Sequence, residues 1–571
     1  MFAPIVSPLF PNGSKTSAMT SVATIFDSEP HFGEVRNTAE LKRVLALPER
    51  DPDKVGELIA APLTARLKTP QGTMALWPKQ ALALAEAADY EGAMVLLPVG
   101  EGKTLITYLL PAVLNAQLES VLIVRAALLQ KTANDFLTLK KHWNAKSAHR
   151  IVTYETVSRD PDILNRLKPK LIIADECHKL KDPKAACTKR VYRYMKENPE
   201  TTFVGLSGTV AQRSFKDYWH LMQWALPKGL QPLPYGFKEM ETWTEALDSK
   251  MKVRRGLGAL TVWGDDVPTV RKAYGEKLRK TPGIVTIQNP KVRASLTIEL
   301  VELKIPAIEE ALKEMRRTWA TPGGEEFCEA VDLWRHAREI ANGFYYKWDP
   351  EPPKEWLEAR SEFMKFVRGK LQGSRKLDTM AQVCDAYADA FEVLEWKEIA
   401  PSFKLRTVAV PLEGQTALRD YVASWQSFNE GLVWVEHRAA GEWLHSQTPY
   451  PYFSKGGNSE NPWFHIDEYK KPAIVSVKAI GEGFNLQRYS KNLVLNCLPL
   501  GSAWEQMIGR THRQGQKADN VHVEVLITAE EQRAGFWQAV KDAHYVQDTT
   551  GQRQKLCYAD IVEKEASWPT H

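Results

Sequence analysis

Short apolar runs alternate with longer segments of helical periodicity in two separate regions of the chain. The first region, from Trp77 to about Pro227, contains the runs "AMVLLPVG", "SVLIVR", "RIVTY", "LIIA" and "FVGLSG". The second region, between residues 431 and 528, contains "GLVWVEH", "AIVSVKAIG", "NLVLNC" and "VHVEVLIT". Short apolar runs separated by helices are typical of strands that pair in parallel and are buried on both faces. The sequence therefore predicts an α/β protein with two parallel sheets covered by helices.

The length of 571 residues is too great for a single hydrophobic core. We expect an N-terminal appendage at 1–70, a first lobe at 71–230, a helical and basic insertion at 231–400, a second lobe at 401–545 and a tail at 546–571. The insertion is rich in Trp, Lys, Arg and Glu, and segments such as "AIEEALKEMRRTWA" have helical periodicity. Few strand patterns occur within it.

The charge and cysteine content limit the kinds of ligand the chain can take. The formal net charge of +5 is small for this length, so any contact with nucleic acid must be local. The six cysteines include no C-x-x-C pair, which argues against a disulfide framework and a zinc site. The N-terminus is a poor signal peptide, and no apolar run approaches the roughly 18 residues of a membrane span. We expect a cytoplasmic protein without a membrane segment.

A phosphate-binding loop is indicated by the sequence "LLPVGEGKTLITYLL", which has the pattern of a strand, a glycine turn and a helix. The N–H groups of such a turn and of the helix N-terminus attract an anion. Gly100 and Gly102 would let the backbone approach the phosphates, Lys103 would reach the β and γ groups, and Thr104 would ligate Mg²⁺. Leu97 stands where the common motif has glycine, and a glycine turn with an incidental lysine is the alternative.

An Asp-Glu pair follows another apolar run, in "LIIADECHKLKD". Beside a phosphate loop, Asp175 would hold Mg²⁺ through water and Glu176 would polarise the attacking water. The alternative is a pair of charges that solvate the end of a strand. The upstream loop favours the first interpretation, because both motifs then serve the hydrolysis of one triphosphate.

Phosphoryl transfer also requires a cation near the γ-phosphate, often an arginine from another domain. The second region offers "EQMIGRTHRQGQ", in which Arg510 and Arg513 are three residues apart and are predicted to share one face of a helix. Either could act as an arginine finger when the two lobes close. An exposed basic helix is the alternative.

The order of these motifs resembles that of superfamily-two helicases and translocases, and within them the Swi/Snf-like group. The resemblance runs from about residue 76 to 533 and includes "LWPKQ", "VLIVRAALLQKTANDF", "IVTYETV", "LSGTVAQRS", "GLVWVEHRAAGEWL" and "SVKAIGEGFNLQ". The ending "RQGQ" favours the Swi/Snf-like group. The resemblance implies two RecA-like lobes in tandem with helical insertions between them, in a compact bacterial or bacteriophage type of protein.

The resemblance also implies roles for individual residues, with ATP and Mg²⁺ as cofactors. Gln80 would bind adenine, and Glu101, Gly483 and Gln506 would also lie at the nucleotide. Coupling of the nucleotide to lobe movement is implied for His178, Ser207, Gly208, Thr209 and Gly481. Nucleic acid would contact Arg125, Thr153, Tyr154 and Ser476.

A basic stretch, "KMKVRRG", adds Lys252, Arg254 and Arg255 as candidates for contact with the phosphates of duplex DNA. A solvated helical face is the alternative for this stretch.

The implied function is a monomeric, ATP-driven motor that moves along or remodels double-stranded DNA, in association with the nucleoid of a bacterial or phage-infected cell. A strand-separating helicase is an alternative, and RNA stays open as its substrate because the spelling D-E-C-H also occurs in RNA-dependent relatives. A slow ATP-gated switch that controls a protein partner is another. Nucleic acid should raise ATP turnover many-fold in a motor and hardly at all in a switch.

Overall fold

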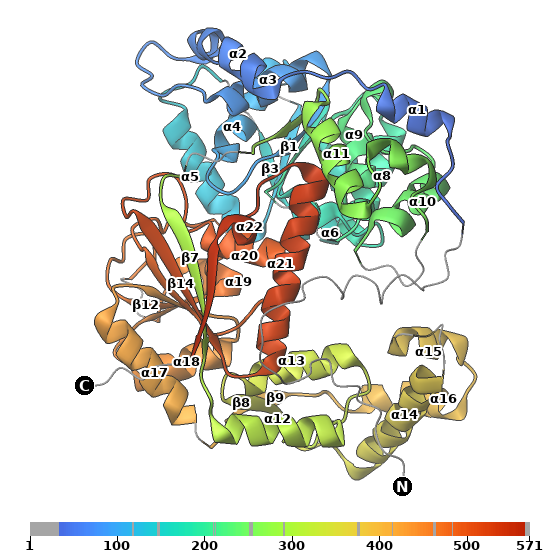
Figure 1. Ribbon diagram of the computed structural model, residues 1–571, viewed down its shortest axis with the longest axis vertical. Helices are drawn as coiled ribbons and strands as arrows, with labels where there is room; N and C mark the ends of the chain where they lie inside the picture. Colours follow the sequence, from blue (N-terminus) through green and yellow to red (C-terminus); the bar gives the residue numbers. More distant parts are fainter. Residues whose placement is uncertain are drawn as a thin grey trace.

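Two α/β lobes stand one above the other in the computed structural model of the protein (Figure 1). The residues that the structure describes are 33–116, 119–145, 149–208, 211, 213–249, 255–288, 292–373, 377, 379–413, 415–460, 464–481 and 483–565. Each lobe is built on one sheet in which every neighbouring pair of strands is parallel. The predicted fold class, two RecA-like lobes in tandem, is confirmed.

The sheet of the first lobe has six strands in the order β3-β2-β4-β5-β1-β6. Their bounds are β1 Gly92–Leu96, β2 Ser120–Val124, β3 Arg150–Thr153, β4 Leu171–Asp175, β5 Thr202–Leu206 and β6 Ile284–Thr286. Met94 and Leu96 of β1 enter one core, whereas Ala93 and Val95 enter another. The two cores lie on opposite faces of the sheet, which explains why the central strands are continuous apolar runs.

Helices cover both faces of this sheet (Figure 1). They are α3 Pro78–Asp89, α4 Lys103–Val113, α5 Leu129–Leu139, α6 Tyr154–Arg159, α7 Ile163–Leu167, α8 Ala186–Glu197, α9 Trp219–Ala225, α10 Phe237–Leu247 and α11 Val267–Lys280. The sequence prediction ended the first lobe at residue 230, but α10, α11 and β6 all belong to it. The three residues of β6 are too few to show a strand pattern.

The described part of the predicted N-terminal appendage also belongs to the first lobe. Leu41 and Val44 of α1 (Ala39–Leu45) are buried in one of its cores. Leu63 and Leu67 of α2 (Pro52–Leu67) are buried in the other. The prediction was wrong here because each helix buries only a few apolar side chains, so its sequence does not show which core it joins. Residues 1–32 lie outside the described part.

The sheet of the second lobe has seven strands in the order β11-β12-β10-β13-β14-β7-β15. Their bounds are β7 Ser295–Glu302, β10 Leu432–Val435, β11 Tyr452–Phe453, β12 Ala473–Ser476, β13 Lys491–Val494, β14 Asn520–Ile527 and β15 Asp560–Glu565. Its helices are α17 Gln415–Phe428, α18 Arg438–Gln447, α19 Val477–Ile480, α20 Gly501–Ile508, α21 Glu530–Thr550 and α22 Lys555–Tyr558. The second lobe was predicted to start at residue 401, but its sheet already includes β7. The predicted tail at 546–571 is also part of this lobe, because β15 pairs with β7.

The predicted helical insertion lies within the second lobe, between β7 and β10, rather than between the lobes. It consists of α12 Pro306–Thr318, α13 Ala330–Ile340, β8 Phe344–Trp348, α14 Lys354–Gly373, α15 Met380–Ala386, α16 Phe391–Ile399 and β9 Thr407–Pro411. Helices α14 to α16 surround a small core of their own, which includes Phe363, Val367 and Val383. The rings of Trp356 and Trp396 pack 4.9 Å apart, so these tryptophans serve the packing of the insertion.

Helix α21 extends from the second lobe onto the first (Figure 1). Tyr545 of α21 donates a hydrogen bond to Asp248 of the first lobe, at 2.7 Å. Arg213 of the first lobe donates to Asp542 of α21, at 2.8 Å between Nε and Oδ2. The end of the chain is therefore a structural bridge between the lobes.

Lys555, just beyond α21, forms a buried ion pair with Glu505 of α20, at 2.9 Å. We expect Lys555→Met to lower the free energy of unfolding by about 3–5 kcal/mol, because the buried Glu505 carboxylate loses its counter-charge. Urea unfolding followed by tryptophan fluorescence measures this change. Lys541→Met, at an exposed position of α21, is the matched control and should change stability by less than about 0.5 kcal/mol. Equal stability of the two variants would contradict the assigned role of the ion pair.

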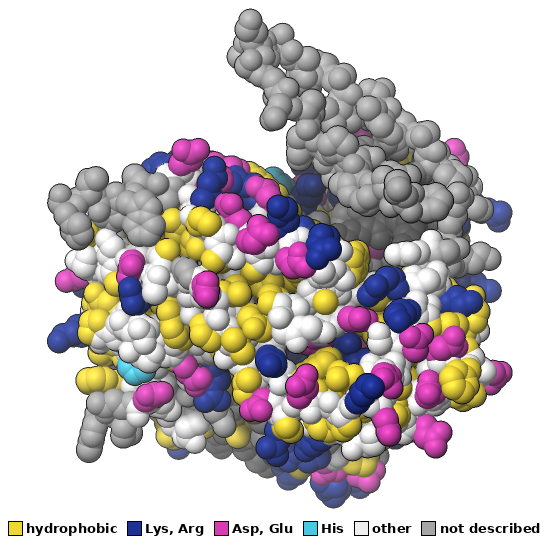
Figure 2. Space-filling model, turned by 90° about the horizontal axis from the view of Figure 1, so that it is seen from below, with side chains coloured by type: hydrophobic (Ala, Val, Ile, Leu, Met, Phe, Trp, Pro, Cys, Tyr) yellow, Lys and Arg dark blue, Asp and Glu magenta, His cyan; other side chains and the backbone are white. Residues whose placement is uncertain are grey.

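The surface carries charges of both signs. On the face shown in Figure 2, Lys and Arg side chains are interspersed with Asp and Glu side chains. None of the helices in the described ranges is long and apolar enough to span a membrane. The same residues include no group of three or more His, Cys, Asp or Glu side chains able to hold a metal ion.

Candidate functional site

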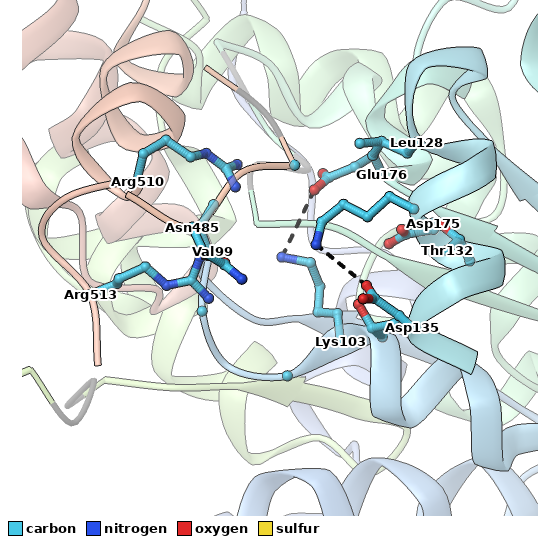
Figure 3. Close-up of a pocket in the computed structure, with 15 residues that line it drawn as sticks. Val99, Lys103, Leu128, Thr132, Asp135, Asp175, Glu176, Asn485, Arg510 and Arg513 are labelled. Carbon is cyan, nitrogen blue, oxygen red and sulfur yellow. Dashed lines mark hydrogen bonds and ion pairs between the residues drawn. The ribbon is translucent and has the colours of Figure 1, made fainter. Parts of the chain in front are cut away.

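Residues of both lobes line one pocket (Figure 3). The first lobe contributes Gly100, Gly102, Lys103, Thr104, Asp175 and Glu176. The second lobe contributes Gly483, Asn485, Arg510 and Arg513. The fold thus brings the glycine loop, the acidic pair and the two arginines together across a cleft between the lobes.

The glycine loop connects the end of β1 to the start of α4. Gly100 and Gly102 have φ angles of +100° and +73°, in the left-handed region that glycine adopts without strain. A Cβ atom on Gly102 would lie 2.2 Å from Nε2 of Gln80, so a larger residue would have to displace the Gln80 side chain as well as adopt the strained positive φ. Lys103 and Thr104 are the first two residues of α4, and its N-terminal N–H groups are available to an anion in the pocket.

The Lys103 ammonium lies between the loop and the acidic pair. Its Nζ donates hydrogen bonds to the carbonyl oxygens of Leu97 at 2.9 Å and Pro98 at 3.3 Å. It also lies 3.9 Å from Oε1 of Glu176. Because its two hydrogen-bond acceptors are neutral carbonyls, the ammonium can turn to a phosphate oxygen without breaking a close ion pair.

Asp175 is the last residue of β4, and its Oδ1 atom is buried without a hydrogen-bond partner among the described residues. Burial raises the pKa of Asp175 to about 7, and repulsion by Glu176 adds to this effect. A buried carboxylate oxygen without a donor, at the edge of a pocket, is a suitable ligand for Mg²⁺, whose charge would keep the group ionised. The Thr104 hydroxyl lines the same pocket.

Glu176 follows with a φ of +55° and is the N-cap residue of the short 3₁₀ helix η2 (Cys177–Leu180). Burial alone would raise the pKa of Glu176, but Lys103, His178 and Arg510 together hold it below its usual range. Glu176 is therefore the charged member of the acidic pair.

His178 connects the acidic pair to the end of β5. Its Nδ1 lies 3.3 Å from Oε2 of Glu176 and 3.1 Å from Oγ of Ser207. A Cβ atom on Gly208 would lie 3.5 Å from the Lys103 ammonium, so this segment also contacts the glycine loop. Three of the residues predicted to couple the nucleotide to lobe movement thus lie near the acidic pair and Lys103, namely His178, Ser207 and Gly208. Thr209 lies outside the described residues.

Arg510 and Arg513 do not share a helix, contrary to the sequence prediction. Helix α20 ends at Ile508, and both arginines lie in the turn that follows Gly509. Glycine has a low helix propensity, and the N–H of Arg510 bonds to the carbonyl of Met507 instead of continuing the helix. A Cβ atom on Gly509 would lie 3.1 Å from Cβ of Val99, so the turn packs directly on the glycine loop.

The two arginines are held differently. Arg510 donates to the carbonyl oxygens of Gly481 at 2.9 Å and Phe484 at 3.3 Å, and burial with the nearby Arg513 charge lowers its pKa to about 9. Arg513 donates to Oδ1 of Asn485 at 2.6 Å, and its buried Nε has no partner in the part of the chain described. Its side chain lies against Gly100, where an added Cβ would be 3.4 Å from Nε. Arg513 thus faces the glycine loop most directly.

Three of the predicted nucleotide-binding residues do not line the pocket. Gln80 lies behind the glycine loop, where its Oε1 accepts from the N–H of Trp77 at 3.0 Å and its Nε2 donates to the Glu101 carbonyl at 3.2 Å. Glu101 is buried, and Gln506 is half-buried on α20. Gln80 therefore holds the loop in place, and its contact with adenine stays a prediction.

Two of the residues predicted to contact nucleic acid cap helices at the ends of strands. Thr153 accepts from the N–H of Thr156 at 3.0 Å, and Ser476 accepts from the N–H of Ala479 at 3.4 Å. Arg125 is half-exposed at the end of β2.

The remaining candidates for nucleic-acid contact are placed elsewhere. Tyr154 is buried and donates to the backbone carbonyl of Asp175 at 2.7 Å, so its side chain supports the acidic pair. Arg255 is paired with Glu245 at 2.7 Å. Lys252 and Arg254 lie outside the described residues.

Sequence reasoning missed Gln552, which is buried beyond α21. Its Nε2 donates to the carbonyl of Gly208 at 2.6 Å and so joins the end of the chain to the segment beside Lys103. The surrounding sequence "GQRQK" shows no periodicity and no motif that could have indicated this contact.

Comparisons with known proteins match part of the chain. Residues 118–263 match the SNF2-related domain. A curated relative, DNA excision repair protein ERCC-6-like 2 of Mus musculus, is 30% identical over 172 residues, which are 28% of this chain and 10% of the mouse protein. The chain thus spans about a tenth of the length of that relative. The matched domain includes the acidic pair but neither the glycine loop nor the two arginines.

Proposed function

Because this chain carries an SNF2-related domain and is related to the Swi/Snf-like helicases and translocases of superfamily two, we propose that it is an ATP-hydrolysing motor that moves along or remodels double-stranded DNA. The observation that supports this best is the shared pocket, in which Lys103 and Glu176 of one lobe face Arg513 of the other. A site divided in this way makes hydrolysis depend on the relative position of the lobes.

Binding of ATP is assigned to the glycine loop. The N–H groups at the start of α4 and the Lys103 ammonium would hold the β- and γ-phosphates. Asp175 and the Thr104 hydroxyl would hold Mg²⁺, which supplies positive charge for the phosphoryl transfer when bound. The unpartnered Oδ1 of Asp175 supports this assignment.

Hydrolysis is assigned to groups on both sides of the cleft. The charged Glu176 carboxylate would orient a water molecule toward the γ-phosphate. Arg513, whose Nε is unpartnered among the described residues, would stabilise the negative charge that develops on the transferred group. Loss of the γ-phosphate removes the charge that attracts Arg513, so the lobes can separate after each turnover.

Double-stranded DNA is the proposed substrate because of the relationship to the SNF2-related domain and because the mouse relative is named as a DNA excision repair protein. Contacts with the phosphates of the backbone rather than with bases would suit a motor of low sequence specificity. A strand-separating helicase, action on RNA and an ATP-gated switch are the alternatives.

The decisive experiment compares ATP turnover alone and with duplex DNA, single-stranded DNA or duplex RNA. We expect duplex DNA to raise turnover at least about tenfold, with a stimulation that falls steeply as salt is added because phosphate contacts release counterions. Displacement of a third strand from a DNA triplex then measures movement along the duplex. Equal turnover with and without every nucleic acid would favour the switch and contradict the motor.

A further inference from the structure

An apolar groove on the first lobe has no role in the nucleotide site. It lies between α8, α9 and α10, and its lining includes Tyr192, Trp219, Trp224, Phe237 and Met240. Tyr192 and Phe237 are 52% and 50% exposed. Phe237 packs edge to face on Trp219, and Tyr192 lies tilted against Trp224. Aromatic side chains that are held in this way yet remain accessible form pockets for bulky apolar side chains of a partner.

The lining of the groove is basic overall, because five Lys or Arg side chains line it together with three acidic ones, Asp182, Glu197 and Asp217. Lys189, Arg193 and Lys196 are exposed along α8 and line the groove. None of the three forms an ion pair with any of the described residues. Unpaired cations around an apolar groove favour a partner that combines bulky apolar side chains with carboxylates.

A surface of that chemistry exists on the helical insertion of the second lobe. The segment "DAYADAFEVLEWKE", residues 385–398, includes five acidic residues and one lysine. Phe391 is 71% exposed, and Leu394, one helical turn away on α16, is 51% exposed. We call this segment the acidic patch. Its exposed apolar residues and its charge are complementary to the groove.

We propose that the acidic patch of one chain docks into the groove of a second copy of the chain. Within one chain the two surfaces are exposed at the same time, with α8 and α10 on the first lobe and α15 and α16 on the insertion below it (Figure 1). In this arrangement of the lobes, which includes the contacts of Gln552 with Gly208 and of Arg213 with Asp542, the two surfaces of one chain lie apart. Two copies can instead form a closed two-fold dimer, in which the acidic patch of each chain lies in the groove of the other.

The test exchanges the charges of the two surfaces. A groove variant carries Arg193→Glu with Lys196→Glu, and a patch variant carries Glu395→Lys with Glu398→Lys. Sedimentation equilibrium of the full chain should show a dimer in the micromolar range, and each variant alone should dimerise at least about tenfold more weakly because like charges then meet. Mixing the two variants should restore the dimer, because every groove again faces a patch of opposite charge.

A charge-matched control carries Lys140→Glu with Lys313→Glu, at exposed positions outside the groove and the patch, and should dimerise like the wild type. Phe391→Ala should weaken the dimer without affecting the fold, since its side chain is mostly exposed. A chain that stays monomeric throughout the micromolar range, or a dimer unaffected by the reversals, would overturn the proposal.

Mixing the groove variant with the patch variant distinguishes docking between two copies from other ways of filling the groove. If the acidic patch reached the groove of its own chain, the wild type would be a monomer and mixing would change nothing. If the groove bound single-stranded nucleic acid instead, the groove variant would lose affinity for a labelled oligonucleotide while the wild type stayed monomeric. Either result would refute docking between copies.

Discussion

Replacing Glu176 by Gln is expected to lower ATP turnover by about 10²–10⁴-fold while ATP binding is retained. Lys103, His178 and Arg510 hold the pKa of Glu176 below its usual range, so the side chain is a carboxylate that can orient and polarise water. The amide of glutamine has the same size but lacks the charge that polarises a nucleophile. It also removes a negative charge facing the triphosphate, so affinity should be equal or higher.

Turnover is measured by phosphate release, and affinity by titration with a fluorescent ATP analogue. Glu200→Gln, at an exposed position of the same lobe, is the isosteric control and should match the wild type in both assays. Thermal unfolding of the Glu176→Gln variant checks that the contact with His178 is not required for the fold. An equal loss of binding and turnover would mean that Glu176 has a structural role only.

The parts of the fold that were predictable from sequence are the strands buried on both faces. β1, β2 and the first four residues of β4 are fully buried, and apart from Ser120 at the start of β2 they appear as short apolar runs. β15 has the sequence "DIVEKE" and lies at the edge of its sheet, where only one side pairs with another strand. An edge strand can carry charged residues, and its sequence therefore does not separate it from a polar tail.

The parts of the candidate site that were predictable are those whose residues directly follow or precede the strand or helix that positions them. The glycines before Lys103 and the carboxylates after β4 are close in sequence to the elements that position them, so the sequence predicted that these two groups share one site. The end of α20 at Ile508 has one local signal, the low helix propensity of Gly509, and the sequence prediction did not use it. The contact of Gln552 with Gly208 depends on packing between the lobes, and no pattern within "GQRQK" indicates it.

Replacing Arg513 by Ala is expected to reduce ATP turnover by about 10³-fold or more, with ATP affinity near that of the wild type. The Arg513 side chain lies against Gly100 and, among the residues that the structure describes, hydrogen-bonds only to Asn485, so its charge is free to act on the transferred phosphate. Its removal should change thermal stability little. Arg513→Lys should recover only part of the rate, because lysine keeps the charge but lacks the planar fork of donors.

Arg510→Ala is the informative comparison for this prediction. Arg510 is buried and donates to the carbonyl oxygens of Gly481 and Phe484, and each acceptor left without a donor costs about 1–3 kcal/mol. We therefore expect Arg510→Ala to lower both the melting temperature and the turnover, whereas Arg513→Ala lowers turnover alone. A wild-type rate in Arg513→Ala would exclude this arginine from the chemistry. The catalytic cation of the second lobe would then have to be Arg510, acting from within the packed turn.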